Sequence, residues 1–262
     1  MKKIRKNQFK SWKEYYHSYQ RTLATDYYIP LIDSYIDIKD KSILEIGCGN
    51  GGFIDGFTDI SDHCVGFDIK DSHNRDSRAM YYRLDVFDSN LVSNFSSKFN
   101  LIILRDVIEH LENSKANILF KNIDRLLEKD GCVLVTFPPF YSPFGLHQQV
   151  LLSNFLRYIP FLSILPKAIV RLITKYGPHN KSNIDELLSL YDSKQTISSF
   201  LSLINRQGYQ ALHSKYFHIR PSHEIRYGLK TIESKIISKI PIIRELLVSG
   251  TVYLIKRYDE VK

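Results

Sequence analysis

The sequence of 262 residues predicts one α/β domain in which helices cover both faces of a mostly parallel sheet. Across residues 42–137, short apolar runs alternate with helical stretches, an order typical of parallel strands joined by crossover helices. Several runs end in an acid, and parallel sheets gather their ligand-binding side chains at the carboxyl ends of the strands. After residue 137 the alternation stops, and prolines cut an apolar segment into short pieces.

In detail, the pattern predicts a Rossmann-like sheet of seven strands with a helical lid insertion. Strands are expected over residues 42–46, 64–69, 80–85, 100–105, 132–137, 209–217 and 251–258. Helices are expected over residues 8–36, 52–57, 115–127, 195–207 and 225–240, with several short helices over 149–175. The last two strands should pair in an antiparallel hairpin, although more than thirty residues separate them.

Three alternating glycines, Gly47, Gly49 and Gly51, follow the first strand, and the acid Glu45 precedes them. A strand, a tight glycine turn and a helix start together let backbone N–H groups approach a ligand closely. Glycine is required there because a Cβ atom would hold the ligand away and disfavour positive φ. The loop therefore predicts a binding site for a nucleoside cofactor.

The same segment also fits the dinucleotide-binding fingerprint, if Gly47, Gly49 and Gly52 are taken as its three glycines. Asp68 then stands at about the ~20-residue distance expected of an acid that holds a ribose. Taken alone, the loop leaves open an NAD(P)-dependent oxidoreductase.

A second motif, Asp106-Val-Ile-Glu-His-Leu111, follows the fourth strand. With the glycine loop, Asp68 and Asp85, it resembles class I S-adenosylmethionine-dependent methyltransferases, especially the ubiquinone-biosynthesis O-methyltransferases. The resemblance covers roughly residues 40–137 and implies methyl transfer from S-adenosylmethionine, at oxygen. The expected cofactor-binding residues are Glu45, Gly47, Gly49, Gly51, Asp68, Ile69, Asp85, Val86 and Arg105. Asp68 would hold the ribose hydroxyls, and Asp85 with Val86 would hold the adenine.

The resemblance further implies a divalent metal site, because some related methyltransferases bind an ion through Glu-x-x-Glu-His. Here the pattern is Asp106-x-x-Glu109-His110, one methylene shorter at its first position. Its spacing would put three ligands on one helical face, with His147 as a fourth. Without a metal, His110 or His147 would act as general base, with Glu109 beside them. A purely structural role for Glu109 and His110 stays open.

The division of the chain follows from these motifs. Residues 1–38 form an N-terminal helical cover, 39–137 a cofactor-binding half, 138–192 the lid insertion, and 193–262 the C-terminal helices and last two strands. The lid is the natural place for the acceptor, and Arg105 is a candidate for holding an anionic group on it. A non-catalytic partner subunit that uses its amphipathic segments as interfaces is a third reading of the chain.

The formal net charge of +8 permits an anionic partner. A small molecule, a glycan or a lipid-linked acceptor is expected; no compact basic stripe with interleaved aromatics favours nucleic acid. The short helices over 149–175 mix large apolar residues with Lys and Arg, a composition compatible with peripheral membrane contact. Three scattered cysteines without metal spacing predict a reduced, cytoplasmic setting. The sequence leaves the oligomeric state open.

Overall fold

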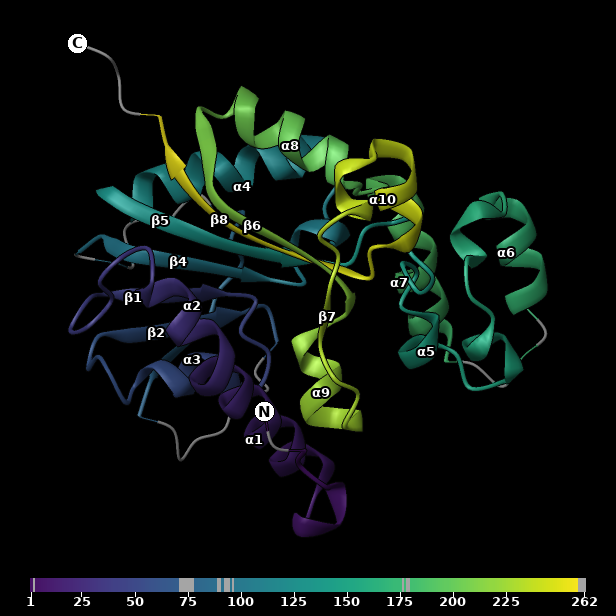
Figure 1. The fold of residues 1–262 in the computed structure, drawn as a ribbon, viewed down its shortest axis with the longest axis horizontal. Coiled ribbons are helices and arrows are strands. Elements are labelled where there is room, and N and C mark those ends of the chain that lie inside the picture. The colour runs from purple at the N-terminus through teal and green to yellow at the C-terminus, as the bar shows by residue number, and fades with distance from the viewer. Residues whose placement is uncertain are drawn as a thin grey trace.

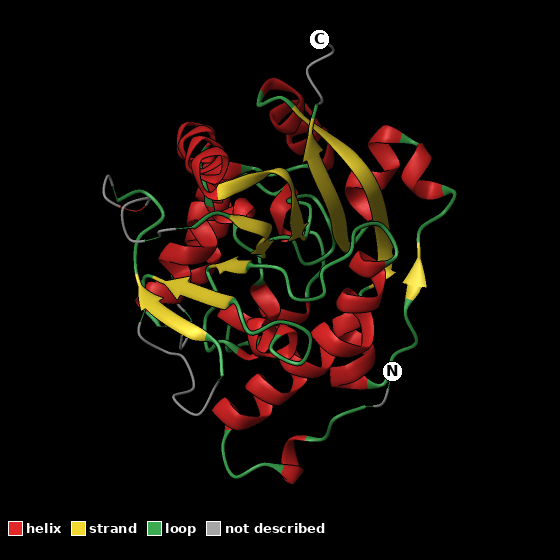
Figure 2. Ribbon diagram, turned by 90° about the vertical axis from the view of Figure 1, so that its left-hand side faces the viewer, coloured by secondary structure: helices red, strands yellow, loops and turns green. Residues whose placement is uncertain are grey.

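A computed structural model describes residues 1, 3–70, 78–88, 91, 95, 97–175, 177 and 180–258. Its centre is a single sheet, shown in Figures 1 and 2. The strands are β1 (Ile43–Ile46), β2 (Cys64–Asp68), β3 (Met80–Arg83), β4 (Phe99–Arg105), β5 (Leu127–Phe137), β6 (Tyr209–Ile219), β7 (Ile232–Glu233) and β8 (Gly250–Arg257). All seven predicted strands are present, with bounds that differ by up to five residues from those expected.

The strand order is β3-β2-β1-β4-β5-β8-β6-β7. Strands β1 to β5 pair in parallel, whereas β8 is antiparallel to both β5 and β6. The expected hairpin of β6 and β8 is therefore confirmed. The strand that the sequence did not predict is β7, whose two exposed residues pair with the outer edge of β6 and bring the sheet to eight strands.

Ten α-helices surround the sheet within the described ranges. They are α1 (Trp12–Leu23), α2 (Ile29–Asp33), α3 (Gly52–Phe57), α4 (Asn113–Leu126), α5 (Gln148–Leu151), α6 (Lys167–Thr174), α7 (Lys181–Ser193), α8 (Ile197–Arg206), α9 (Pro221–Tyr227) and α10 (Pro241–Leu247). No helix in these ranges is long and apolar enough to cross a membrane.

Alternate residues of the strands feed two separate cores, one on each face of the sheet. In β1, Leu44 packs with α4 and α8, whereas Ile43 packs with the aromatic and aliphatic side chains of α1 and α3. Figure 1 shows these helices on opposite sides of the sheet. The lid has a third core of its own, around Phe140, Val170 and Leu187. The predicted two-sided α/β architecture is confirmed.

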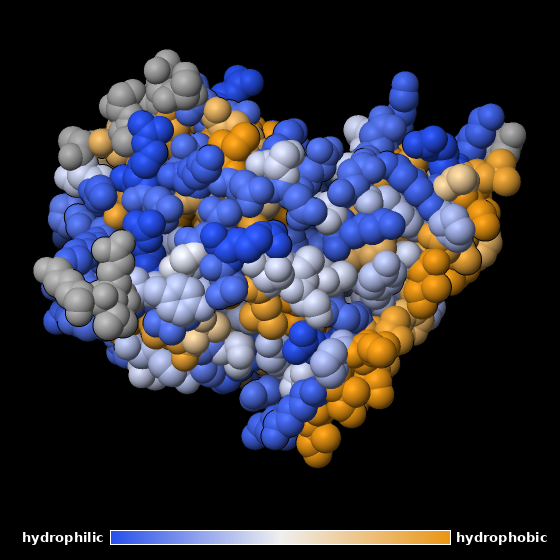
Figure 3. All heavy atoms as spheres, turned by 90° about the horizontal axis from the view of Figure 1, so that it is seen from above, coloured by the Kyte–Doolittle hydropathy of each residue, from blue (hydrophilic) through white to orange (hydrophobic). Residues whose placement is uncertain are grey.

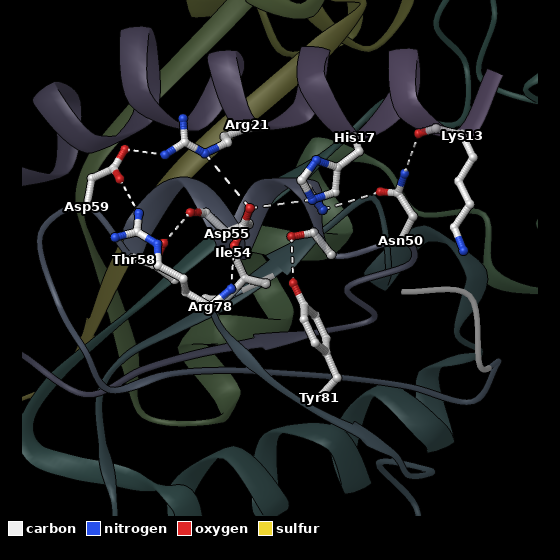
Figure 4. Close-up of polar contacts among 12 residues, drawn as sticks. Lys13, His17, Arg21, Asn50, Ile54, Asp55, Thr58, Asp59, Arg78 and Tyr81 are labelled. Carbon is white, nitrogen blue, oxygen red and sulfur yellow. Dashed lines mark hydrogen bonds and ion pairs between the residues drawn. The ribbon is translucent and has the colours of Figure 1, made fainter. Parts of the chain in front are cut away.

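The N-terminal cover is fastened to the first crossover helix by charged pairs (Figure 4). His17 Nε2 lies 3.5 Å from a carboxylate oxygen of Asp55, and Arg21 donates to Asp59 at 2.5 Å. The two helices meet so closely that a Cβ atom on Gly52 would stand 2.4 Å from the carbonyl oxygen of His17. Helix α1 is therefore held directly over the start of α3.

Two expected helices differ in the structure. The predicted helix over 225–240 does not form. Helix α9 ends at Tyr227 and is capped by Gly228 with φ 74°, a short strand and a 3-10 turn follow, and α10 begins at Pro241. The helix expected over 115–127 is α4, which starts at Asn113 and ends at Leu126, because Leu127 belongs to β5.

Candidate active site

The glycine loop joins the end of β1 to the start of α3. Gly47 N and Cys48 N donate to the carbonyl of Phe67 on the neighbouring strand, at 2.9 and 3.1 Å. Gly47 and Gly51 have φ of 74° and 80°, in the left-handed region. A Cβ atom on Gly47 would stand 2.7 Å from Val107, and one on Gly51 would stand 2.2 Å from the hydroxyl of Tyr81. Both positions require glycine for conformation and for space.

Glu45, at the end of β1, stabilises this loop through a hydrogen bond to the start of α3. Its Oε2 accepts a hydrogen bond from the backbone N–H of Ile54 at 3.0 Å, and Arg105 Nη1 lies 3.9 Å from Oε1. Burial raises the pKa of Glu45 to about 8 against the opposing effect of Arg105. The guanidinium of Arg105 also stacks on the Phe53 ring at 3.9 Å. Arg105 is thus held in place by Glu45 and Phe53, and its contact to a cofactor or to an anionic group remains a prediction.

Two cavities lie side by side at the carboxyl ends of the strands. The first, here called the loop cavity, has a volume of about 180 Å³ and is lined mainly by the glycine loop, with Tyr16 and Gln20 of α1. The second, called the lid cavity, has a volume of about 290 Å³ and lies between α1, the lid and α9. Both are lined by Tyr16, Arg105 and Asp106.

Five predicted cofactor residues lie outside the linings of the loop and lid cavities: Gly51, Asp68, Ile69, Asp85 and Val86. Asp68 accepts hydrogen bonds from Gly49 N and Lys70 N, both at 2.9 Å, so that it ties the glycine loop to the end of β2. Ile69 is exposed beside it. Asp85 is exposed and accepts from Phe87 N at 2.9 Å in a turn, while Val86 is buried in the core. Their contacts to a nucleoside remain predictions.

Glu109, His110 and His147 come together beside the lid cavity, which His110 and His147 line. A potential ligand atom from each lies within 4.8 Å of the other two. His147 Nε2 is 3.7 Å from Glu109 Oε1, and the two imidazole rings meet edge to face with centroids 5.3 Å apart. Both carboxylate oxygens of Glu109 and the Nε2 atom of His147 are buried without a hydrogen-bond partner among the described residues. Buried polar atoms normally have partners, so this cluster has the character of a binding site.

Burial sets the protonation of these groups. It raises the pKa of Glu109 well above the usual value, helped by the nearby charge of Asp106. Burial and the neighbouring His110 lower the pKa of His147 to about 4, and burial also lowers the pKa of His110. Both imidazoles are therefore neutral at pH 7 and each offers a nitrogen lone pair.

Asp106 does not share a helical face with Glu109 and His110, contrary to expectation. Its φ of 52° puts it outside the following 3-10 turn (Ile108–His110), and its carboxylate accepts two hydrogen bonds from Arg220 Nη2, at 2.8 and 3.1 Å. Burial alone would raise the pKa of Asp106, but the positive charges of Arg220 and Arg105 hold this pKa below its usual value. Asp106 is therefore a partner of Arg220 and lies outside the group of Glu109, His110 and His147.

Several lid-cavity residues were not predicted as site residues. Tyr16 and Tyr19 come from α1, while His223 and Arg226 come from α9 together with the preceding Arg220. The guanidinium of Arg226 packs on the rings of Tyr19 and Tyr227, 5.2 and 5.1 Å from their centroids. Within the described residues it makes no ion pair, and its Nε is buried without a hydrogen-bond partner. The only signal in the sequence was the gathering of aromatic and basic residues in these segments.

A family model described as a methyltransferase domain matches residues 16–177 of the chain. The match covers more than half of the sequence, so the chain belongs to this family, within the class of S-adenosylmethionine-dependent methyltransferases that its motifs resemble. The choice that the loop left open is settled: the chain is a methyltransferase and not a dinucleotide oxidoreductase. The closer likeness to ubiquinone-pathway enzymes stays a prediction.

Solved structures share the fold at low identity. Magnesium protoporphyrin IX methyltransferase of Synechocystis, solved with S-adenosylhomocysteine, has a TM-score of 0.52 at 10% identity, over 98% of this chain and 90% of that chain. The plantazolicin methyltransferase BamL, solved with S-adenosylhomocysteine and a triazolic desmethylPZN analogue, has a TM-score of 0.53 at 13% identity, over 92% of this chain and 86% of that chain. The pyocyanin biosynthetic protein PhzM has a TM-score of 0.47 at 11% identity over 94% of this chain, which spans 56% of that longer protein. A comparison with curated proteins finds no match.

Proposed function

We propose that this methyltransferase binds S-adenosylmethionine in the loop cavity and methylates an oxygen atom of an acceptor held in the lid cavity. The observation that carries the proposal is that the two cavities adjoin along shared residues. When bound, S-adenosylmethionine supplies an electrophilic methyl group on a sulfonium. The residues fit it, because Gly47 and Gly49 line the loop cavity and the position of a Cβ atom on Gly49 is open space where a cofactor can approach the backbone.

The chain's own contribution to the reaction is positioning and proton transfer. A neutral imidazole of His110 or His147 accepts the proton of the acceptor hydroxyl as its oxygen becomes the nucleophile. Glu109 faces His147 and holds its orientation within the cluster. The acceptor classes that suit this cavity are a small molecule, a sugar or a lipid-linked intermediate.

The binding test uses the whole chain and two matched glycine variants. S-Adenosylhomocysteine at about a hundred times its Kd should stabilise the protein by about 2.7 kcal/mol, whereas NADH should not. Gly47→Ala should abolish this stabilisation. Gly208→Ala is the control, because Gly208 also has positive φ (77°) but a Cβ atom there meets nothing within 4 Å. Stabilisation by NADH alone would overturn the proposal.

Metal binding by Glu109, His110 and His147 is a second proposal, supported by their unpartnered buried atoms. A divalent ion there would lower the pKa of an acceptor hydroxyl that coordinates it. Titration of Mg²⁺, Mn²⁺ or Zn²⁺ into metal-free protein, followed by calorimetry, should show one saturable site. Glu109→Gln should weaken it at least tenfold. Glu186 lines the same cavity but lies outside the cluster, so Glu186→Gln should leave the metal affinity unchanged. If no metal binds at millimolar concentration, the metal proposal fails and the imidazoles act only as bases.

A further inference from the structure

An apolar edge runs along one side of the molecule and belongs to neither cavity (Figure 3). It combines the lid, over residues 155–173, with the insertion between β6 and β8, over 236–247. Among its side chains, Phe155, Tyr158, Leu172, Ile236 and Ile242 are 60–79% exposed. Ile164 of the lid and Ile242 of α10 line the same surface hollow, so the two segments form one continuous surface. Exposed apolar areas of this kind mark interaction sites.

Helix α6 shows that this exposure is built into the sequence. Val170 and Thr174 face inward and are buried, whereas Ile169, Leu172 and Ile173 lie on the outer side. A helix on a water-exposed surface normally turns its polar side outward. In α10, no residue is buried at all, and Ile242 is 79% exposed. Both helices therefore present apolar side chains where water would otherwise favour polar ones.

Most charged side chains around this edge are basic, although Lys167 is paired with Asp192 at 2.6 Å, Arg244 lies 4.0 Å from Glu245, and Glu233 of β7 is exposed nearby. From residue 138 to 175 the sequence has no Asp or Glu, and it has four basic residues, Arg157, Lys167, Arg171 and Lys175. The insertion adds Lys235, Lys239 and Arg244. Glu245 of α10 is turned inward. Its carboxylate accepts hydrogen bonds from Ile197 N and Ser198 N at the start of α8, at 2.8 and 2.9 Å. The edge thus combines apolar side chains with a positive border.

We propose that the apolar edge docks this protein on an anionic membrane surface. The apolar side chains would enter the boundary between headgroups and acyl chains, and the basic side chains would lie at the lipid phosphates. A second copy of the chain is a poorer occupant, because its own basic border would have to face this one. Val150 is 73% exposed and lines the lid cavity, so the cavity opens next to the edge. Docking would bring that opening to the lipid surface.

Vesicle sedimentation with the full chain tests this proposal. Vesicles of phosphatidylcholine with about 30% phosphatidylserine should bind the protein at least tenfold more tightly than pure phosphatidylcholine, and added salt should weaken the binding. Leu172→Glu with Ile242→Glu should lower the affinity at least tenfold, and Arg171→Glu should lower it for the anionic vesicles. Ile118→Glu is the matched control, because Ile118 is 46% exposed on α4, away from the edge.

Stabilisation by S-adenosylhomocysteine should be the same in all these variants, which checks their folding and keeps this test separate from the proposed methyl transfer. Failure of the unaltered protein to sediment would overturn the docking proposal, as would an equal loss in Ile118→Glu. A stable dimer in light scattering that Leu172→Glu dissociates would also overturn it, because a second copy would then cover the edge.

Discussion

At the scale of single residues, the lid cavity stands out for polar atoms that lack partners. Glu109, His147 and Arg226 come from three separate segments, and each has a buried polar atom without a hydrogen bond among the described residues. Leaving such atoms unpaired costs free energy, so a protein keeps them where a ligand completes the pairing. If the proposed acceptor binds in this cavity, its hydroxyl would lie at the Glu109–His147 pair, and an acidic group on it would pair with the guanidinium of Arg226.

Arg226 offers a direct test of the acidic group. Pyrophosphate is a suitable probe, because the guanidinium fork binds phosphate oxygens well. Arg226→Met should weaken pyrophosphate binding at least tenfold, as measured by calorimetry, while Arg206→Met on the exposed side of α8 should leave it unchanged. Equal affinities in all three proteins would mean that the cavity does not select an anionic acceptor.

His223 predicts a pH dependence of stability. Burial and the neighbouring Arg220 and Arg226 lower its pKa to about 4. Because the pKa of His223 is lower in the folded protein than in the unfolded chain, the unfolded chain takes up a proton first as the pH falls. The stability that the neutral His223 contributes is therefore complete above about pH 6.5 and is lost as the pH falls toward 4. Between pH 7 and 5 the loss should be at most about 2 kcal/mol of unfolding free energy. Urea unfolding at each pH should show this loss of unfolding free energy in the unaltered protein and a smaller loss in His223→Asn. If the stability of both proteins fell equally with pH, His223 would not be its source.

Sequence reasoning identified the site residues whose roles depend on local backbone geometry. The alternating glycines and Glu45 were predicted because the loop needs positive φ and close approach, and the structure has both. The helical face that Asp106 was expected to share with Glu109 and His110 was predicted wrongly, because the spacing shows neither the positive φ of Asp106 nor its partner Arg220, which lies 114 residues away. The role of Arg226 was missed for the same reason, since only the packing of α9 against α1 brings it to Tyr19.

At the scale of elements, the contact of α1 with α3 controls how the N-terminal cover sits over the glycine loop. Gly52→Ala would force its Cβ against the backbone of His17, at 2.4 Å in the present arrangement. Overpacking of this kind costs about 1–3 kcal/mol, more than alanine gains as a helix former. Chemical unfolding should therefore show a less stable protein. A variant as stable as the original would mean that α1 can shift without loss.

The elements themselves were predictable where one periodicity dominates. Buried strands β1, β2, β4, β5 and β8 read as apolar runs, and their pairing follows from the alternation with helices. The prediction of a helix over 225–240 was wrong because the spacing of its isoleucines suggested the buried face of a helix. Several of these isoleucines are instead exposed on the apolar edge. The spacing of apolar residues alone therefore shows neither that a helix forms nor that those residues are buried.

At the scale of the whole molecule, the site is assembled from three distant parts of the chain: α1, the strand ends with the lid, and α9. S-Adenosylhomocysteine should therefore slow amide hydrogen exchange in residues 47–57 and also in α1, which contributes Tyr16 and Gln20 to the loop cavity. Exchange in α6 and α10 should not change. Protection confined to α6 and α10 would mean that the ligand binds elsewhere.

The position of β8 also bears on how the chain reaches its native state. This strand comes last in the sheet's chain order, yet it lies between β5 and β6 and pairs Lys256 with Cys132. Until it arrives, β5 presents an unpaired edge, which is the kind of surface that recruits other chains. Pairings this distant in sequence also form slowly. The interval before β8 inserts is therefore the time at which a newly made chain is most exposed to aggregation, and folding yield should depend on how quickly that final strand finds its place.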